Sequence, residues 1–168
     1  MKRILCAILL ISALVCMLAG CGLTVSRPEI KEGEFAFSVT YELGGETKTV
    51  SGVYVCKYRG TDWALDGVSH RDWDGYIKDG TVSETIRLAV AEDGGIVELN
   101  LVFEPGRFMG DPYREGEEPF EPWITVRIED AEGLSFENDA DLIAAVYGAR
   151  IIDYEYDRPI ENSFGLFK

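Results

Sequence analysis

The residues best suited to chemistry gather in one stretch of the chain, where carboxylates stand among large aromatic side chains. Four acids, Asp62, Asp66, Asp72 and Asp74, lie in or beside the turns expected there. Hard oxygen ligands of this kind bind Ca²⁺ in proteins. Their spacing does not match the calcium-loop pattern. We therefore expect solvated turn carboxylates, and no metal site is predicted.

Aromatic rings in the same stretch suggest a second kind of chemistry. Trp63, Trp73 and Tyr76 offer flat apolar faces beside these carboxylates, the combination that sugar-ring stacking and hydroxyl recognition require. Packing into a core is the more ordinary use of such rings. Glycan binding by these three residues is therefore a hypothesis, and it requires the rings to be exposed and coplanar.

Motifs for catalysis are missing from the sequence. His70 is the single histidine, which excludes a multi-histidine metal site. There is no Gly-x-Ser-x-Gly, no phosphate-binding Walker loop and no paired cysteine motif. A hydrolase that uses two carboxylates remains an alternative, because the sequence does not show which acids converge. We predict no catalytic residue and no cofactor, and an enzyme is not the favoured class.

The first twenty-one residues have the composition of a targeting segment. Lys2 and Arg3 precede an uncharged apolar run over 4–19, and small residues follow at its end. These are the three parts of a secretory signal peptide. The run is also shorter than a comfortable membrane span. The segment is therefore expected to direct export rather than to fold.

Leu18-Ala19-Gly20-Cys21, at the end of this run, resembles the lipobox of bacterial lipoproteins. The resemblance implies that the Cys21 thiol receives a diacylglyceryl group, that residues 1–20 are removed, and that palmitate-type acyl chains anchor the protein outside the cytoplasm. Each buried methylene would contribute about 0.8 kcal/mol to anchoring. The implied location is the cell membrane or an outer membrane. An ordinary signal peptide with a chance cysteine, or an uncleaved anchor, is the alternative.

Charge and cysteine content narrow the expected partners. The chain has a net charge of −14, which becomes −16 without Lys2 and Arg3. This balance argues against nucleic acid and against lying flat on anionic lipid. Cys56 would be the one free thiol of the mature chain and is expected in the core. The expected partners are the membrane, through the lipid, and an envelope protein or glycan.

The remaining chain is expected to form a tether and one domain. Residues 21–32 are polar, contain Pro28 and show no periodicity, which is typical of a linker. Residues 33–168 are long enough for a single β-rich globular domain with its own core. The expected function is that of a binding or structural module of the cell envelope.

Alternating apolar residues and frequent turns predict a mainly β fold, an antiparallel β-sandwich or a barrel-like domain. The clearest pair is 34–43 and 46–58, joined by a two-residue turn at Gly44-Gly45. Asp139 and Gly148 bracket one short α-helix near 139–147. Turns are expected at 59–62 and 130–133. Further strands are expected over 63–65, 71–77, 85–91, 96–103, 123–129, 150–156 and 163–167. For 85–91 a helix opened by a capping box at 81–84 is the alternative.

The segment 104–122 is the longest stretch without a predicted element. Four of the six prolines fall in it, and such long loops in compact domains are usually functional or disordered. Phe108, Tyr113 and Phe120 offer apolar anchors among its acids. We hypothesise that these three residues bind a partner. A mobile insertion without a role is the alternative.

Overall fold

The computed structural model describes residues 25–63, 69–130 and 133–165, with the side chains of Trp63 and Asp130 left out. The predicted signal peptide, its lipidation site Cys21 and the first residues of the predicted tether lie outside the described residues. Residues 64–65 of the predicted strand 63–65 and residues 166–167 of the predicted strand 163–167 do so as well. Within the three described ranges, no helix is long and apolar enough to cross a membrane.

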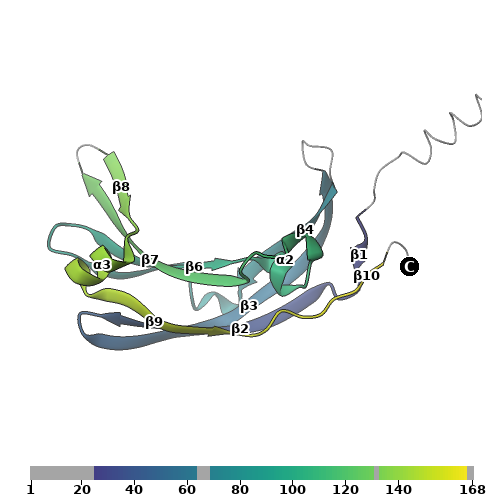
Figure 1. Ribbon diagram of the computed structural model, residues 1–168, viewed down its shortest axis with the longest axis horizontal. Coiled ribbons are helices and arrows are strands. Elements are labelled where there is room, and N and C mark those ends of the chain that lie inside the picture. The colour runs from purple at the N-terminus through teal and green to yellow at the C-terminus, as the bar shows by residue number, and fades with distance from the viewer. Residues whose placement is uncertain (1–24, 64–68, 131–132, 166–168) are drawn as a thin grey trace, which may run out of the picture.

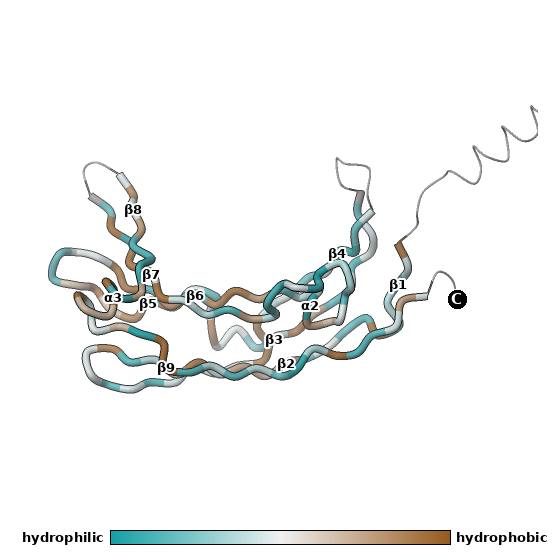
Figure 2. The backbone as a smooth tube through the Cα atoms, in the orientation of Figure 1, coloured by the Kyte–Doolittle hydropathy of each residue, from teal (hydrophilic) through white to brown (hydrophobic). Residues whose placement is uncertain are grey.

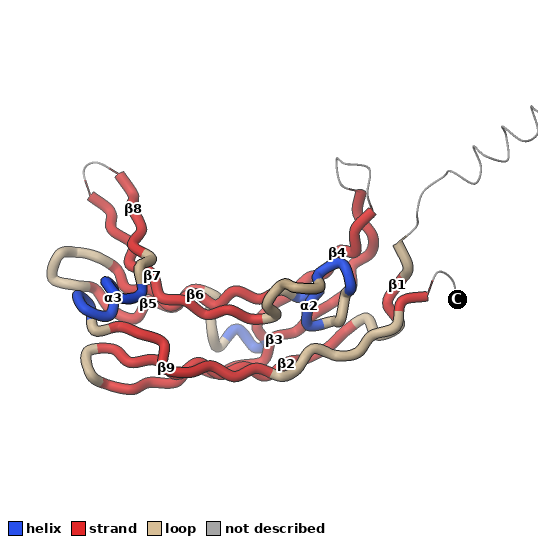
Figure 3. The backbone as a smooth tube through the Cα atoms, viewed as in Figure 1, coloured by secondary structure: helices blue, strands red, loops and turns tan. Residues whose placement is uncertain are grey.

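The described chain is mainly β, as predicted, with short helical segments between strands (Figures 1 and 3). The strands are β1 Arg27–Pro28, β2 Glu32–Leu43, β3 Glu46–Trp63, β4 Ser69–Ile77, β5 Thr85–Val90, β6 Ile96–Phe103, β7 Phe120–Asp130, β8 Gly133–Glu137, β9 Ala149–Tyr156 and β10 Phe164–Gly165. The helices are α2 Pro105–Phe108 and α3 Ala140–Tyr147, and the 3-10 turns are η1 Lys78–Gly80 and η2 Pro112–Arg114.

The first sheet has the strand order β4-β3-β2-β9, and all its neighbours are antiparallel. Its centre is the predicted β2–β3 hairpin, in which Gly44 and Gly45 take φ values of 59° and 83°. Positive φ at both positions fits a tight hairpin turn. Phe35 lies opposite Tyr54, so the apolar residues of the two strands share one face as expected.

Strand β3 is longer than the sequence suggested. The turn predicted at 59–62 is wrong, because β3 continues through these residues and pairs with β4. A register shift between Tyr58 and Gly60 marks the place where the turn was expected, and Gly60 has a φ of 149°. A bulge of this kind bends a strand without ending it.

The second sheet has the order β5-β6-β7-β8 and is also antiparallel throughout. The hairpin of β5 and β6 confirms the predicted strands 85–91 and 96–103. Strand β8 was not predicted: the sequence analysis passed from a turn at 130–133 directly to the helix. β8 has only five residues and four of them are exposed, so it contributes little to a buried face.

The core lies between the two sheets. In Figure 1, β6 and β7 run over β2 and β9, and Figure 2 shows that apolar residues recur along the facing strands. Phe37, Phe103 and Phe120 pack together from three different strands, with ring centroids 4.7–5.4 Å apart. The buried thiol of Cys56 belongs to the same cluster, as its position in an apolar strand predicted.

Helix α3 begins and ends where the sequence indicated. The Asp139 side chain accepts hydrogen bonds from the backbone N–H groups of Asp141 and Leu142, both at 3.0 Å. Gly148 ends the helix with a φ of 61°, a left-handed conformation that glycine adopts without strain. Ile143 is buried against the core.

Two segments expected to be irregular are ordered parts of the domain. The region 104–122 contains α2, η2 and the start of β7, so the prediction that no regular element forms there is wrong. Part of the predicted tether is also paired, since β1 bonds to β10 and the Glu29 N–H donates to the Ser163 carbonyl at 2.8 Å. Prolines fit here because short turns and edge strands tolerate a missing N–H.

Candidate functional site

A buried ion pair stands where the two ends of the described chain meet the first sheet. Arg71 on β4 and Asp111, between α2 and η2, each have a side-chain exposure of only 2%. Arg71 Nη1 donates to Asp111 Oδ1 at 2.6 Å. A charge taken out of water is costly unless it is paired and hydrogen-bonded. The two side chains therefore depend on each other to remain buried.

The Asp111 carboxylate is held in place from three directions. Its Oδ2 accepts a hydrogen bond from Trp73 Nε1 at 2.8 Å, and its Oδ1 accepts one from the Tyr113 N–H at 3.1 Å. The second bond caps η2, whose first residue is Pro112. The Asp111 N–H in turn donates to the Gly106 carbonyl at 2.9 Å. A carboxylate bonded in this way fixes the segment 105–114 on β4.

The Arg71 guanidinium also holds both ends of the described chain. Its Nε donates to the Ser26 carbonyl at 2.7 Å and its Nη2 to the Ser26 hydroxyl at 2.9 Å. The Phe164 ring centroid lies 4.1 Å from its central carbon and the Tyr113 centroid 5.1 Å away, distances typical of cation–π contacts. We call this cluster the terminal junction: Ser26, Arg71, Trp73, Asp111, Tyr113 and Phe164.

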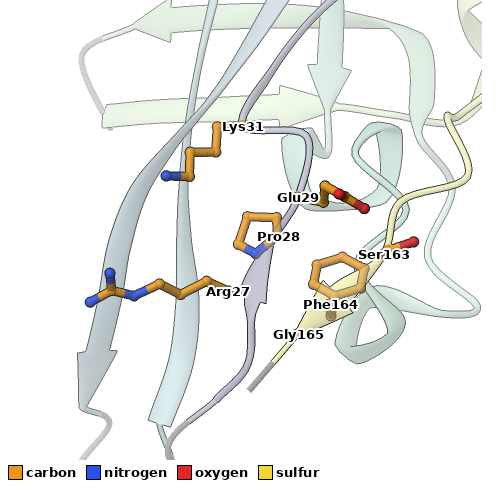
Figure 4. A pocket seen from close by; sticks show the side chains of 7 residues that line it. All are labelled: Arg27, Pro28, Glu29, Lys31, Ser163, Phe164 and Gly165. Atoms are coloured by element: carbon orange, nitrogen blue, oxygen red, sulfur yellow. The ribbon is translucent and has the colours of Figure 1, made fainter. Parts of the chain in front are cut away.

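A cavity of about 520 Å³ lies beside the terminal junction and is lined by residues of the paired strands β1 and β10 and their neighbours (Figure 4). Its apolar lining comes from Pro28 and Phe164, and the exposed cations Arg27 and Lys31 stand at its edge. Figure 4 shows Arg27 and Lys31 directed to one side of β1, away from Phe164, with Glu29 on the other side. Its volume is in the range of small-molecule sites. The apolar surface of Phe164 therefore adjoins the Glu29 carboxylate rather than the two cations, and the lining suits a ligand with an apolar part.

A second cavity of about 240 Å³ opens on the other members of the cluster. His70, Arg71, Asp111, Tyr113 and Arg114 line it. Asp111 is committed to its three hydrogen bonds, so it is poorly placed to act as a base. The His70 and Tyr113 rings meet edge to face with centroids 6.5 Å apart. This arrangement can hold a small polar group and has no nucleophile paired with a base.

Glu104 and Glu117, which both lie near Arg114, form the carboxylate pair that most resembles a catalytic pair. Burial raises the pKa of Glu104, while the nearby Arg114 lowers it and Glu117 raises it. Arg114 lies 3.8 Å from Glu104 and 3.3 Å from Glu117. Perturbed carboxyl pairs occur in active sites and also in structural ion clusters. Neither acid lines the two cavities described above.

Of the three residues predicted to bind a partner, two are buried and one is exposed. Phe108 and Phe120 have exposures of 0% and pack in the core, so the expectation that they are exposed anchors is wrong. Their apolar rings are what holds 104–122 to the sheets. Tyr113 is 58% exposed and remains available on the surface. A shared partner surface for all three is therefore not formed.

The proposed glycan-binding rings do not form one platform. Trp73 is half-buried and donates to Asp111, while Tyr76 is exposed. Being three residues apart on β4, their side chains point to opposite faces of the strand. The Trp63 side chain lies outside the described residues. The hypothesis required coplanar exposed rings, and Trp73 and Tyr76 do not meet it.

In the described ranges, no group of three or more His, Cys, Asp or Glu side chains is arranged to hold a metal ion. Comparison of the chain with protein-family descriptions, with curated proteins and with solved structures gave no match. The terminal junction was missed in the sequence analysis. One signal was present: Arg71 has the same strand parity as Trp73, so it faces inward and needs a partner.

Proposed function

We propose that this protein is a membrane-anchored lipoprotein of the bacterial cell envelope, whose β-domain is a binding or structural module. The observation that carries the proposal is Leu18-Ala19-Gly20-Cys21 at the end of an uncharged run. The fold supports a short connection to the membrane. Ser26, held by Arg71, is five residues beyond Cys21, and five residues span at most about 18 Å.

The cavity lined by β1 and β10 residues supports binding as the role of the domain. It lies at the same end of the domain as Ser26, so an anchor at Cys21 would keep it near the membrane surface. Its apolar lining by Pro28 and Phe164, with charges of both signs around it from Arg27, Glu29 and Lys31, favours a ligand with an apolar part. An envelope component with this chemistry is the proposed ligand class.

Metabolic labelling tests the anchor. The full chain should incorporate labelled palmitate and sediment with membranes, and Cys21→Ser should lose both properties. Cys16→Ser is the matched control, because Cys16 lies in the same run but outside the lipobox. This variant should be labelled and sediment as the chain without substitutions does. Label retained by Cys21→Ser, or absent from the chain without substitutions, would refute the proposal.

A carboxylate-pair hydrolase is the second candidate function. The observation that favours it is the placement of Glu104 and Glu117 on the same Arg114 side chain, with burial raising the pKa of Glu104. Purified protein would then release reducing ends from envelope glycan, and Glu104→Gln should abolish that release. Glu118→Gln, at an exposed neighbouring position, should leave the rate unchanged. An unmodified chain without activity on such glycans would rule this function out.

A further inference from the structure

Strand β8 is a short edge strand that lacks two of the features that protect sheet edges, a bulge and, from Gly133 to Phe136, a charged side chain. The described part of the chain has four edges in its two larger sheets, formed by β4, β9, β5 and β8. The pairings of β4, β5 and β9 each contain a register shift, whereas β7–β8 has none. Exposed charges on the first three are Asp72, Asp74, Arg87, Arg150, Asp153 and Glu155. Bulges and charges both discourage pairing between molecules.

The composition of β8 favours pairing. From Gly133 to Phe136 it carries no charge, in a chain with a net charge of −14. Leu134 and Phe136 are each 55% exposed, and residues two apart on a strand share one face. Figure 1 shows the β7–β8 hairpin projecting from the rest of the molecule, so its outer edge is accessible.

We infer that β8 is a self-association surface through which two copies of this chain pair as antiparallel strands around a two-fold axis at Ser135. This alignment places Leu134 of one copy opposite Phe136 of the other. Gly133, which has no side chain, lies opposite Glu137, the one charge of the strand. Cross-strand apolar pairs of this kind stabilise antiparallel sheets.

A second copy fits this edge because a two-fold interface requires a self-complementary strand. On the face that carries Leu134 and Phe136, β7 places Glu129 beside Leu134 and Arg127 beside Phe136. The two-fold axis brings each Glu129 into the same row as the Arg127 of the other copy. Opposite charges therefore end each row, with the two apolar residues between them, and each Arg127 is also paired within its own chain with Glu98 at 3.3 Å and with Glu129 at 3.6 Å. The acidic surface elsewhere repels a second copy.

The size of the contact sets its strength. Pairing of two five-residue strands buries much less than the roughly 1,600 Å² of a standard protein interface. The dimer is accordingly weak and reversible, and covalent trapping is the appropriate way to detect it. The inference concerns the β-domain alone and does not depend on the proposed lipid anchor.

Thiol trapping of Ser135→Cys in the full chain tests the pairing. Residues directly opposite in an antiparallel pair have Cβ atoms about 4.5–5.5 Å apart, within reach of a short bismaleimide. Of the four native cysteines, Cys56 is buried. Cys6, Cys16 and Cys21 are replaced by serine in every chain compared, so that the introduced thiol is the one that reacts. A product of twice the chain mass is expected from Ser135→Cys, while Thr85→Cys, exposed on the β5 edge, should give only the background of the unmodified chain.

A second substitution shows whether the apolar face drives the contact. Phe136→Lys in the Ser135→Cys chain should reduce the trapped dimer to the Thr85→Cys level, whereas Ile152→Lys on the β9 edge should leave it unchanged. Ile152 is a matched control because it is also an exposed apolar residue of an edge strand. Equal trapping at Thr85 and Ser135, no trapped dimer, or trapping of a different protein at position 135 would overturn the inference.

Discussion

The two ends of the molecule treat their side chains in opposite ways. At the terminal junction, charged groups are buried: Arg71 and Asp111 are enclosed and bonded to each other. At the β7–β8 hairpin, apolar groups are exposed, with Leu134 and Phe136 more than half accessible. A buried pair cannot lose one member without a large cost. An exposed apolar strand has no such constraint and gains by meeting another surface. The first end therefore closes the fold, and the second is open to association.

The largest effect expected from this comparison comes from breaking the buried pair. Asp111→Asn leaves the Arg71 cation enclosed without its counter-charge, and removal of one partner of a buried pair costs about 3–5 kcal/mol. Urea unfolding followed by tryptophan fluorescence measures the loss. Glu34→Gln, which breaks the exposed contact of Glu34 with Lys78, is the control and should not change the midpoint. A midpoint equal to that of the control would mean that Arg71 is satisfied without Asp111.

Two phenylalanines, one from the core and one from the hairpin, sharpen the same contrast. Phe120→Ala should cost about 3–5 kcal/mol, because the ring fills the core and its removal leaves a cavity. Phe136→Ala should change the free energy of unfolding by less than about 0.5 kcal/mol, as expected of a surface position. Thermal unfolding of both variants gives the comparison. Similar losses would show that Phe136 is buried in solution.

Two buried ionisable groups, Cys56 and Tyr54, lead us to expect that the free energy of unfolding falls at high pH. Burial raises the pKa of the Cys56 thiol from 9.0 to about 12, and burial likewise raises the pKa of Tyr54. The folded thiol keeps its proton where the unfolded thiol loses it. The contribution of the Cys56 thiol to the free energy of unfolding is therefore complete below pH 9 and is lost as the pH rises toward 12.

The unfolding free energy should accordingly decline over that range, and the decline should be shallower in Cys56→Ala when each variant is compared with its own value at pH 8. The folded protein should also resist a thiol reagent at pH 8 and react after denaturation. Identical slopes for both chains, or rapid modification of the folded protein, would contradict the burial of Cys56.

The smallest effect is expected at the cap of α3, next to the hairpin. Asp139→Ala removes the side-chain acceptor of two backbone N–H groups and should cost about 1 kcal/mol. Asp141→Asn, in the first turn but not at the cap, should cost less. Hydrogen exchange would show the first amides of α3 losing protection in Asp139→Ala alone. An unchanged exchange rate would mean that other groups cap this helix.

The parts of the fold that local patterns determine were predictable. Alternation gave β2, β3 and β6, and the residues Asp139 and Gly148 gave both ends of α3. Strand β8 was missed because both its faces are largely exposed, and the extension of β3 was missed because Gly60 signals a turn as well as a bulge. These failures arise where one local pattern fits two structures.

The terminal junction was missed for a different reason. Arg71 and Asp111 lie 40 residues apart, and their pairing depends on how α2 packs on β4. Phe108 and Phe120 were assigned to a surface loop because prolines and acids surround them in sequence, although their rings are buried. The average composition of the segment predicted an irregular loop, whereas the burial of these two rings holds it in an ordered structure.

The position of Ser26 has a mechanical consequence. Tension applied to the chain ahead of Ser26 is taken up first by its two hydrogen bonds with Arg71 and by the β1–β10 pair. Arg71 passes the load sideways into β4 and, through Asp111, into the segment that follows α2. The pull is thus spread over several attachment points before it reaches β2 at the centre of the first sheet. A force on the N-terminal segment would therefore have to break the Ser26–Arg71 hydrogen bonds and the β1–β10 pair before it could unfold the first sheet.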